Sequence, residues 1–279
     1  MHTKIHISNA QKTFGTGTNA VIALQDIHLE ITNNEFITFV GASGCGKSTL
    51  LRAIGGLESL TAGNISIDGV SIKKPGVDRA MVFQHYSLYP WLTVIGNIKF
   101  CRQLKTGREN LSSADVEAAS GRADTLLALM GLTHVRGYYP NQLSGGMQQR
   151  VAIARALMSR PLTLLMDEPF GALDAQTREV MHDLILHVSK LEKTTIVFVT
   201  HDVEEAIYLG QRVVVMAPRP GRIDSIYKVD LPDKRNQDMK LSAQFLQQKK
   251  EILTRIRETA GMHTDFELLE RMSRTVEGN

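Results

Sequence analysis

The sequence predicts an α/β protein in which a sheet of buried parallel strands carries a phosphate-binding loop and is interrupted by a helical block. The apolar run 36–40 leads into residues 41–49, which fit the loop pattern G-x-x-x-x-G-K-[ST]. Two further apolar runs, 162–166 and 195–200, have the continuous hydrophobicity of parallel strands covered on both faces. Residues 91–160 follow a helical period instead, which predicts a helical insertion between the loop and the later strands.

The composition is that of a globular protein with a substantial core. The chain has 279 residues, 43% of them hydrophobic and 22% charged. A formal net charge of +3 is too small to indicate a nucleic-acid partner. Two cysteines without a CxxC pair favour a reducing compartment and argue against disulfides or a zinc site. The sequence has neither a secretory signal nor a run of about 18–20 apolar residues, so we expect any membrane link to run through partner subunits.

Residues 3–33 alternate in the manner of β-strands. Phe14 lies between the alternating stretches, beside Gly15 and Gly17. Its aromatic ring could stack on adenine, and it could equally be an ordinary hairpin side chain. Further along, the alternation over 64–72 around Asp68-Gly69 predicts a β-hairpin.

The loop at 41–49 is expected to hold the phosphates of a nucleotide. Its glycines allow tight turns that aim backbone N–H groups at phosphate, and the following helix adds the positive end of its dipole. Lys47 can reach the β- and γ-phosphates, while the Ser48 hydroxyl can bind Mg²⁺. We expect thiol modification of Cys45 to block ATP. The residues assigned to nucleotide binding here are Gly41, Ala42, Ser43, Gly44, Cys45, Gly46, Lys47, Ser48 and Thr49.

A second anion site is expected at the start of another helix. Ser144 is a good N-cap for a helix that stops before Pro161, and the glycines at 145 and 146 leave its backbone amides uncrowded. Taken alone, this stretch could be no more than a capped helix. Its combination with a phosphate loop upstream makes phosphate binding by Leu143, Ser144, Gly145 and Gly146 the more specific interpretation.

Polar side chains follow three of the expected core strands, where an open α/β sheet binds its ligands. Gln84 follows the short strand 81–83 and could reach Mg²⁺ or the attacking water, or be a plain loop residue. Asp167 and Glu168 end the run 162–166, where two adjacent acids are costly unless they bind something charged. Asp167 fits a ligand of Mg²⁺ and Glu168 a base for the attacking water, and the alternative is a pair of solvated turn acids. His201 ends the run 195–200, where its imidazole could contact the γ-phosphate, whereas His85, His134, His182 and His187 are interpreted as structural.

The phosphate loop, Gln84, LSGGM at 143–147, LTLLMDE at 162–168, GALD at 171–174 and His201 occur in the order found in ATP-binding cassette (ABC) proteins, and residues 3–235 resemble that family. The resemblance implies a P-loop NTPase core with an antiparallel β-subdomain and an inserted α-helical subdomain. On that basis, the core with its β-subdomain spans 1–90 and 161–232 and the helical subdomain spans 91–160. A C-terminal helical tail, for which we expect no chemistry of its own, spans 233–279.

The resemblance also implies a mechanism that needs two chains. In the family, two cassettes pair head to tail, and each ATP lies between the phosphate loop of one and the 144–146 segment of the other. Asp174 resembles the residue through which the two sites communicate. Two anion-binding helix starts on different subdomains suit such a symmetric sandwich. ATP and Mg²⁺ are the implied cofactors, and ATP hydrolysis is the implied activity.

Within the family, DEPFGALD at 167–174, HDVEEA at 201–206 and the stretch 209–223 resemble bacterial importers of nitrate, sulfonate, taurine or bicarbonate. This implies a homodimer at the cytoplasmic face of the membrane, bound to permease subunits that an extracytoplasmic binding protein supplies. A groove with Tyr86, Tyr89 and Trp91 would receive the permease, although Trp91 could equally pack in the helical subdomain. Regulation by a fused substrate-sensing domain is not expected.

Two other assignments stay open. One is the cassette of an exporter or a lipid-transport system, against which the importer-like stretches count. The other is a soluble cassette ATPase that acts on DNA or ribosomes. That class carries a long coiled-coil insertion or a second cassette, and neither is found in this sequence.

Overall fold

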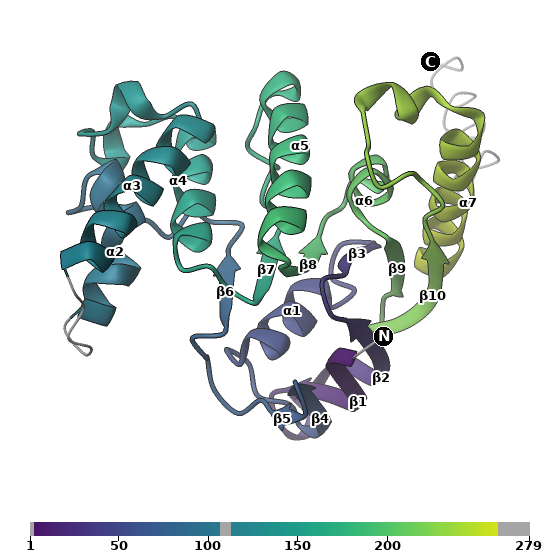
Figure 1. Ribbon diagram of the computed structural model, residues 1–279. Helices are drawn as coiled ribbons and strands as arrows, with labels where there is room; N and C mark the ends of the chain where they lie inside the picture. Colours follow the sequence, from purple (N-terminus) through teal and green to yellow (C-terminus); the bar gives the residue numbers. More distant parts are fainter. Residues whose placement is uncertain (1–2, 107–112, 262–279) are drawn as a thin grey trace, which may run out of the picture.

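Two β-sheets organise the chain, one largely parallel and one antiparallel (Figure 1). The computed structural model describes residues 3–106 and 113–261, excluding the side chains of 101–120. The core sheet has the strand order β10-β9-β3-β8-β7-β6, in which β10 runs antiparallel to β9 and the other pairs are parallel. Its strands are β3 (Phe36–Gly41), β6 (Arg79–Val82), β7 (Thr163–Asp167), β8 (Thr195–Val199), β9 (Arg212–Ala217) and β10 (Arg222–Lys228).

The antiparallel sheet forms a separate layer, in the order β2-β1-β4-β5. Its strands are β1 (Thr3–Phe14), β2 (Val21–Thr32), β4 (Ala62–Ile67) and β5 (Val70–Ser71). The predicted hairpin at 64–72 is confirmed, since β4 and β5 pair around Asp68 and Gly69. Both turn residues have positive φ, +49° and +77°, as a tight hairpin turn requires.

Helices cover both faces of the core sheet (Figure 1). On one side α1 packs with the antiparallel sheet in one apolar cluster, and on the other α4, α5, α6 and α7 share a second cluster. The helices are α1 (Lys47–Gly55), α2 (Val94–Thr106), α3 (Ser113–Leu129), α4 (Gly145–Met158), α5 (Ala175–Glu192), α6 (Val203–Leu209) and α7 (Ala243–Ala260). Short 3₁₀ turns occupy Gly17–Asn19, Thr133–Val135, Pro140–Gln142 and Gln237–Leu241.

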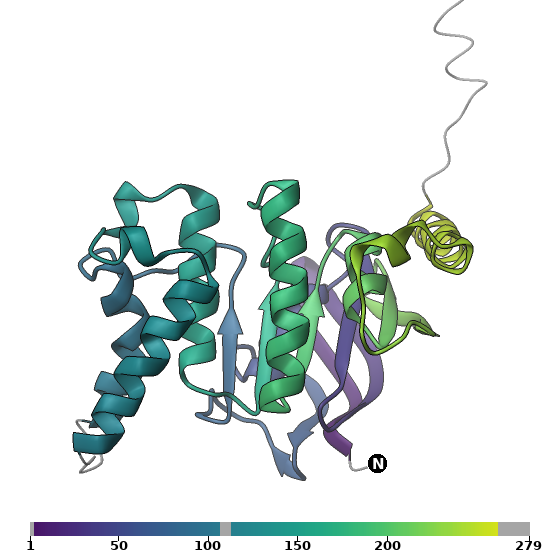
Figure 2. The ribbon, with the colours of Figure 1, turned by 45° about the horizontal axis from the view of Figure 1, so that its top comes forward.

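The helical insertion forms a group of its own at one end of the core sheet. Figure 2 shows α2, α3 and α4 together at the left, beside β6. Apolar residues of α3 and α4 pack against each other and continue into the core, among them Leu126, Leu127, Val151 and Ile153. The insertion and the antiparallel sheet agree with the expected fold class, whereas the residue boundaries drawn from the sequence remain a prediction.

The end of the described chain packs onto the core. Phe245 and Ile252 of α7 are fully buried in the same cluster as α6. The rest of the expected tail, residues 262–279, lies outside the described residues. Within the described part of the chain, no helix is long and apolar enough to cross a membrane.

Register in the core sheet determines where the polar strand ends meet. Asp167 is opposite Val199, so β7 and β8 end side by side. The Glu168 N–H donates to the Val199 carbonyl at 2.9 Å and the Thr200 N–H to the Phe39 carbonyl at 3.1 Å. The residues that follow β7 and β8 therefore emerge next to the loop that follows β3.

Candidate functional site

The phosphate loop joins the end of β3 to the start of α1. Gly41 has φ +152°, and a Cβ there would come within 2.4 Å of the Met216 carbonyl oxygen. Gly46, the N-cap of α1, has φ +91°, and a Cβ there would come within 2.8 Å of the Ala23 carbonyl oxygen. A side chain at either position would strain the backbone or collide with a neighbouring strand. The glycines therefore set both the shape of the loop and its close packing on β2 and β9.

Lys47 is held beneath this loop. Its side chain is largely buried, and Nζ donates to the carbonyl oxygens of Gly41 at 2.9 Å and Ala42 at 3.1 Å. The ammonium group thus lies at the centre of the turn. A cation in this position, below backbone N–H groups and a helix N-terminus, favours an anion in the loop.

Asp167 at the end of β7 touches the first turn of α1. The Ser48 hydroxyl donates to Asp167 Oδ1 at 2.8 Å, and Asp167 is 2% exposed. Burial raises the pKa of this carboxyl, and the hydrogen bond from Ser48 opposes the shift. A buried carboxylate next to a hydroxyl is a pair of oxygen ligands of the kind that Mg²⁺ prefers.

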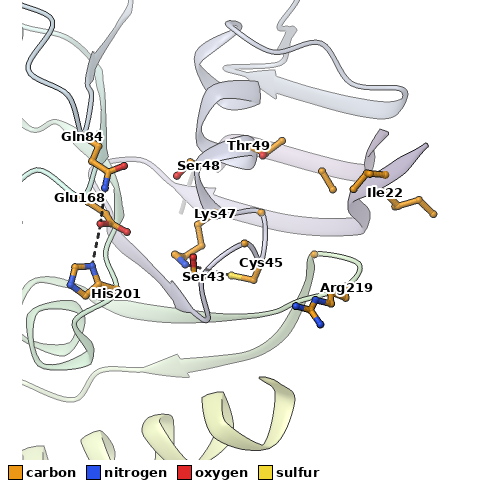
Figure 3. A pocket seen from close by; sticks show the side chains of 15 residues that line it. Ile22, Ser43, Cys45, Lys47, Ser48, Thr49, Gln84, Glu168, His201 and Arg219 are labelled. Atoms are coloured by element: carbon orange, nitrogen blue, oxygen red, sulfur yellow. Dashed lines mark hydrogen bonds and ion pairs between the residues drawn. The ribbon is translucent and has the colours of Figure 1, made fainter. Parts of the chain in front are cut away.

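Glu168 is the meeting point of three strand ends (Figure 3). Its Oε2 lies 3.3 Å from Gln84 Nε2 and 3.1 Å from His201 Nδ1. Gln84 follows β6, Glu168 follows β7 and His201 follows β8, which are neighbours in the sheet. Glu168 also has φ +46°, a left-handed conformation uncommon for residues other than glycine. Two of the side chains predicted at the strand ends, Gln84 and His201, thus both contact a third, Glu168.

A pocket of about 690 Å³ contains most of these groups. Among the predicted residues, it is lined by Ser43, Gly44, Cys45, Gly46, Lys47, Ser48, Thr49, Gln84, Glu168 and His201. Gly41 and Ala42 shape the loop from below, and Asp167 reaches it through Ser48. The structure therefore assembles the loop and the three strand ends into one concave site.

Sequence reasoning missed the far wall of this pocket. Val21, Ile22 and Ala23 of β2 line it, together with Arg219 and Gly221 of the β9–β10 turn. The turn packs tightly, because a Cβ on Gly221 would come within 2.4 Å of the Ala23 carbonyl oxygen and 2.5 Å of the Cys45 carbonyl oxygen. The Pro-Arg-Pro-Gly punctuation at 218–221 marked a turn in the sequence, but not its contact with the phosphate loop.

Phe14 and Cys45 sit differently from what a simple interpretation of the motifs suggests. Phe14 is 42% exposed and pairs with Val21 across the β1–β2 hairpin, but it does not line the pocket itself. The Lys12 ammonium lies 4.8 Å from the centre of its ring.

Cys45 is fully buried, packed in the cluster under α1. Block of ATP by thiol modification of Cys45 stays a prediction, and the burial of this side chain means that the loop must first expose the thiol.

The second anion site lies apart from the pocket. Ser144 caps α4, accepting a hydrogen bond from the Met147 N–H at 3.3 Å. Neither it nor Leu143, Gly145 or Gly146 lines the pocket of the same chain. Gly145 is close to another surface residue, since a Cβ there would come within 2.6 Å of the Tyr86 hydroxyl.

Asp174 caps α5 and is also outside the pocket. Its carboxylate accepts a hydrogen bond from the Thr177 N–H at 3.0 Å, and this bond holds the pKa of Asp174 below its usual value. Gly146 lies near Ala172 and Leu173, just before Asp174. The start of α4 and the start of α5 are therefore neighbours at the surface.

The fold and the pocket define a phosphate-loop protein of the α/β class. The family model that matches residues 24–171 is described as "ABC transporter". An uncharacterized ABC transporter ATP-binding protein of Methanocaldococcus jannaschii is 47% identical over 91% of this chain and 91% of that protein. The nitrate import ATP-binding protein NrtD of Synechocystis sp. is 45% identical over 82% of this chain and 83% of its own length. The aliphatic sulfonates import ATP-binding protein SsuB of Bacillus licheniformis is 43% identical over 80% of this chain and 83% of its own length.

A solved structure agrees with this assignment. The dimeric ATP-binding cassette MJ0796, in a post-hydrolysis state with ADP and phosphate, has a TM-score of 0.73. It is 34% identical and covers 82% of this chain and 100% of its own. The chain belongs to the ABC transporter family and is an ATP-binding, ATP-hydrolysing cassette.

Proposed function

We propose that this cassette is the ATPase subunit of an importer for a small anion such as nitrate, a sulfonate, taurine or bicarbonate. It works as a homodimer that closes on two ATP molecules at the cytoplasmic face of the membrane and drives permease subunits. The observation that carries the proposal is the division of the phosphate-binding groups within one chain. The loop with Lys47 and Glu168 lines a pocket, whereas the capped helix at Ser144 lies outside it.

The residues of the pocket suit a magnesium nucleotide. Lys47, now bonded to loop carbonyls, would instead meet the β- and γ-phosphates, and the loop N–H groups would surround the phosphate chain. Ser48 and Asp167, already 2.8 Å apart, would hold Mg²⁺ together with Gln84. The ion would neutralise charge on the phosphates. The raised pKa of Asp167 fits this assignment, because a buried carboxylate with one hydrogen bond gains most from a cation.

Hydrolysis is assigned to the strand-end triad. Glu168 is the general base that accepts a proton from the attacking water, since its carboxylate lines the pocket that also contains the phosphate loop. His201 and Gln84, each in contact with Glu168 Oε2, fix its orientation and border the place of the γ-phosphate.

The base and sugar of the nucleotide are assigned to the far wall. Val21 and Ile22 are apolar side chains with 63% and 51% exposure, an unfavourable state that a flat heterocycle would relieve. Phe14, beside Val21, completes this surface as the stacking residue proposed from the sequence. Arg219 lines the same wall, and its planar guanidinium can stack on the base.

A second copy completes the site. The backbone N–H groups of Ser144, Gly145 and Gly146 in that copy would approach the γ-phosphate from across the interface. Its Leu143 would lie behind them. The similar cassette MJ0796 is a dimer, and the residues at the start of α4 in this chain do not line the pocket of the same chain. Asp174, next to that start on the surface, is positioned to link the two sites.

The permease contact is assigned to the aromatic surface beside α2. Trp91 is 68% exposed, so the alternative in which it packs in the helical subdomain is wrong. Its ring lies 5.5 Å from that of Tyr89, over which the Arg155 guanidinium is placed at 5.4 Å. Tyr86 connects this surface to Gly145 at the start of α4. A permease helix bound here would therefore act on the element that binds the second nucleotide.

Co-expression with the cognate permease tests the proposal. We expect the cassette to copurify with the permease and its ATPase activity to rise when the extracytoplasmic binding protein is loaded with its anion. Trp91→Ala should abolish copurification and leave the ATP affinity of the isolated cassette unchanged. Stimulation only by an exported or lipid substrate would contradict the importer, and sedimentation with DNA or ribosomes without any permease would contradict transport altogether.

A further inference from the structure

Helix α6 begins two residues after His201, which is proposed to border the γ-phosphate. His201 ends the β8 segment, and Asp202 caps the helix by accepting hydrogen bonds from the Glu204 N–H at 2.8 Å and the Glu205 N–H at 3.3 Å. The helix itself, Val203–Leu209, is only 7 residues long. A helix this short has little stability of its own in water. The position of α6, and of His201 before it, is therefore determined by what packs on it.

One end of α6 is held by Arg235. Its guanidinium donates to the carbonyl oxygens of Ile207 at 3.2 Å and of Gly210 at 2.9 Å, and it also donates to that of Tyr208. These are among the carbonyls that a helix C-terminus leaves without partners. A positive charge at that position also suits the helix dipole. Arg235 thus closes the C-terminal end of α6 from outside the helix.

The other end of α6 is held by two lysines. Glu204, in the first turn, pairs with Lys249 at 2.7 Å and with Lys240 at 3.5 Å. The hydrogen bond from Lys249 holds the pKa of Glu204 below its usual value. The Lys240 ammonium also lies 5.0 Å above the ring of Tyr208 on the same helix. Between these contacts, Phe245 is fully buried against the core.

The opposite side of α6 is tied to α5. His182 Nε2 lies 2.7 Å from Glu205 Oε1 in a buried pair, and the Tyr208 hydroxyl donates to Asp183 at 2.6 Å. Gln237, from the same segment as Arg235, donates to Asp183 at 3.0 Å. Helix α6 therefore lies between α5 and the C-terminal segment, as Figure 1 and Figure 2 both show.

We propose that residues 235–252 form a clamp that holds α6 at both ends and thereby positions His201 against Glu168. The C-terminal segment is then a working part of the ATPase and not a passive tail. Arg235 and Lys249 are positioning residues, because they touch α6 and not the nucleotide pocket. The inference rests on the catalytic role proposed above for His201.

The chain offers a matched control for this clamp. Arg255 of α7 forms a two-pronged ion pair with Asp224 of β10, at 2.6 and 2.8 Å, on the same helix as Lys249. This pair fastens α7 to the sheet without touching α6. Loss of the Arg255–Asp224 pair should loosen α7 about as much as loss of the Lys249 pair does. The Arg255 variant therefore separates an effect on general stability from an effect on the position of His201.

The experiment compares Arg235→Ala, Lys249→Ala and Arg255→Ala in the full chain. We expect the first two to lower kcat roughly tenfold or more, since small misplacements at a reacting centre have large effects on rate. The ATP dissociation constant should stay within about twofold of the wild type, and Arg255→Ala should leave kcat near the wild-type value. Each variant is also made with His201→Ala, and turnover is followed in single-turnover assays. If the clamp acts through His201, Arg235→Ala should cost almost nothing further in that background.

Three results would overturn the clamp. They are a wild-type kcat for both clamp variants, an equal loss of kcat on Arg255→Ala, and an undiminished fold loss in the His201→Ala background. If Arg235→Ala does not fold, Lys249→Ala and Glu204→Gln decide the question, because the first removes one surface ion pair of Glu204 and the second removes both. A separate result, near wild-type turnover of His201→Ala alone, would refute the role proposed for His201 and not the contacts of the clamp.

Discussion

Replacement of Glu168 by Gln removes the proposed general base and should leave the other functions of the pocket intact. The amide has the same size, and its oxygen can still accept hydrogen bonds from Gln84 Nε2 and His201 Nδ1, which now lie 3.3 and 3.1 Å from the carboxylate. Within the described residues, the hydrogen bonds of the Glu168 side chain go to Gln84 and His201 and not to the phosphate loop, so ATP binding should be preserved. What is lost is the ability to accept a proton from water.

The size of the effect follows from that single loss. A positioned general base contributes about 10²- to 10⁴-fold to a rate, which corresponds to about 2.7–5.5 kcal/mol in the barrier. We therefore expect kcat to fall by at least about 100-fold, with the ATP dissociation constant within about threefold of the wild type. The melting temperature should change little, because the side chain is partly solvated and keeps its partners.

The assay is steady-state phosphate release at saturating ATP and Mg²⁺, combined with calorimetric titration of ATP. Glu168→Asp is the matched control, since it keeps a base but draws it back from His201, and it should retain more turnover than the Gln variant. Turnover of Glu168→Gln within about fivefold of the wild type would refute the assignment of Glu168 as base.

Three further substitutions probe the rest of the pocket. Lys47→Ala should raise the ATP dissociation constant about tenfold to a hundredfold, which is the equivalent of one charge-assisted hydrogen bond of about 1.5–3 kcal/mol. An unchanged dissociation constant in a calorimetric titration would contradict the role of Lys47. Asp167→Asn should stop Mg²⁺-dependent turnover yet raise the melting temperature of the nucleotide-free protein at pH 7. Burial raises the pKa of Asp167, so its ionised form destabilises the fold at neutral pH and this cost disappears as the pH falls through the folded pKa. The gain in melting temperature of Asp167→Asn over the wild type should therefore shrink as melting is repeated at lower pH. A melting temperature of Asp167→Asn below that of the wild type at pH 7 would contradict this prediction. Arg219→Ala should weaken ATP binding by several-fold without affecting the binding of inorganic tripolyphosphate. Arg222 does not line the pocket, so Arg222→Ala should leave the binding of both ligands unchanged. Equal weakening of both ligands by Arg219→Ala would place Arg219 at the phosphates.

The sequence was most informative where backbone geometry determines the chemistry. The loop pattern requires glycine at 41 and 46, and the structure shows why, since a Cβ at either site would collide with a neighbouring strand. The strand ends were also predictable, because buried apolar runs form parallel strands and their carboxyl ends share one edge. Gln84, Glu168 and His201 meet there as expected.

Contacts between distant segments were not predictable from the same patterns. Arg219 lies in a turn whose Pro and Gly mark a reversal but not a partner, and its place in the pocket depends on how Gly221 packs on Cys45. Helical spacing indicated α7, yet nothing in that spacing specifies that Phe245 and Arg235 engage α6. Burial of Cys45 likewise depends on the side of the loop that faces the core.

Dimer formation is the central claim, and light scattering of Glu168→Gln with and without ATP and Mg²⁺ tests it most directly. We expect a monomer without nucleotide, a dimer with ATP, and a monomer under both conditions when Ser144→Arg is added, because the arginine would fill the space where the partner's γ-phosphate must lie. Calorimetry and thermal melting should show that Ser144→Arg still folds and binds ATP. An ATP-dependent dimer that persists in the Ser144→Arg protein would contradict the head-to-tail sandwich.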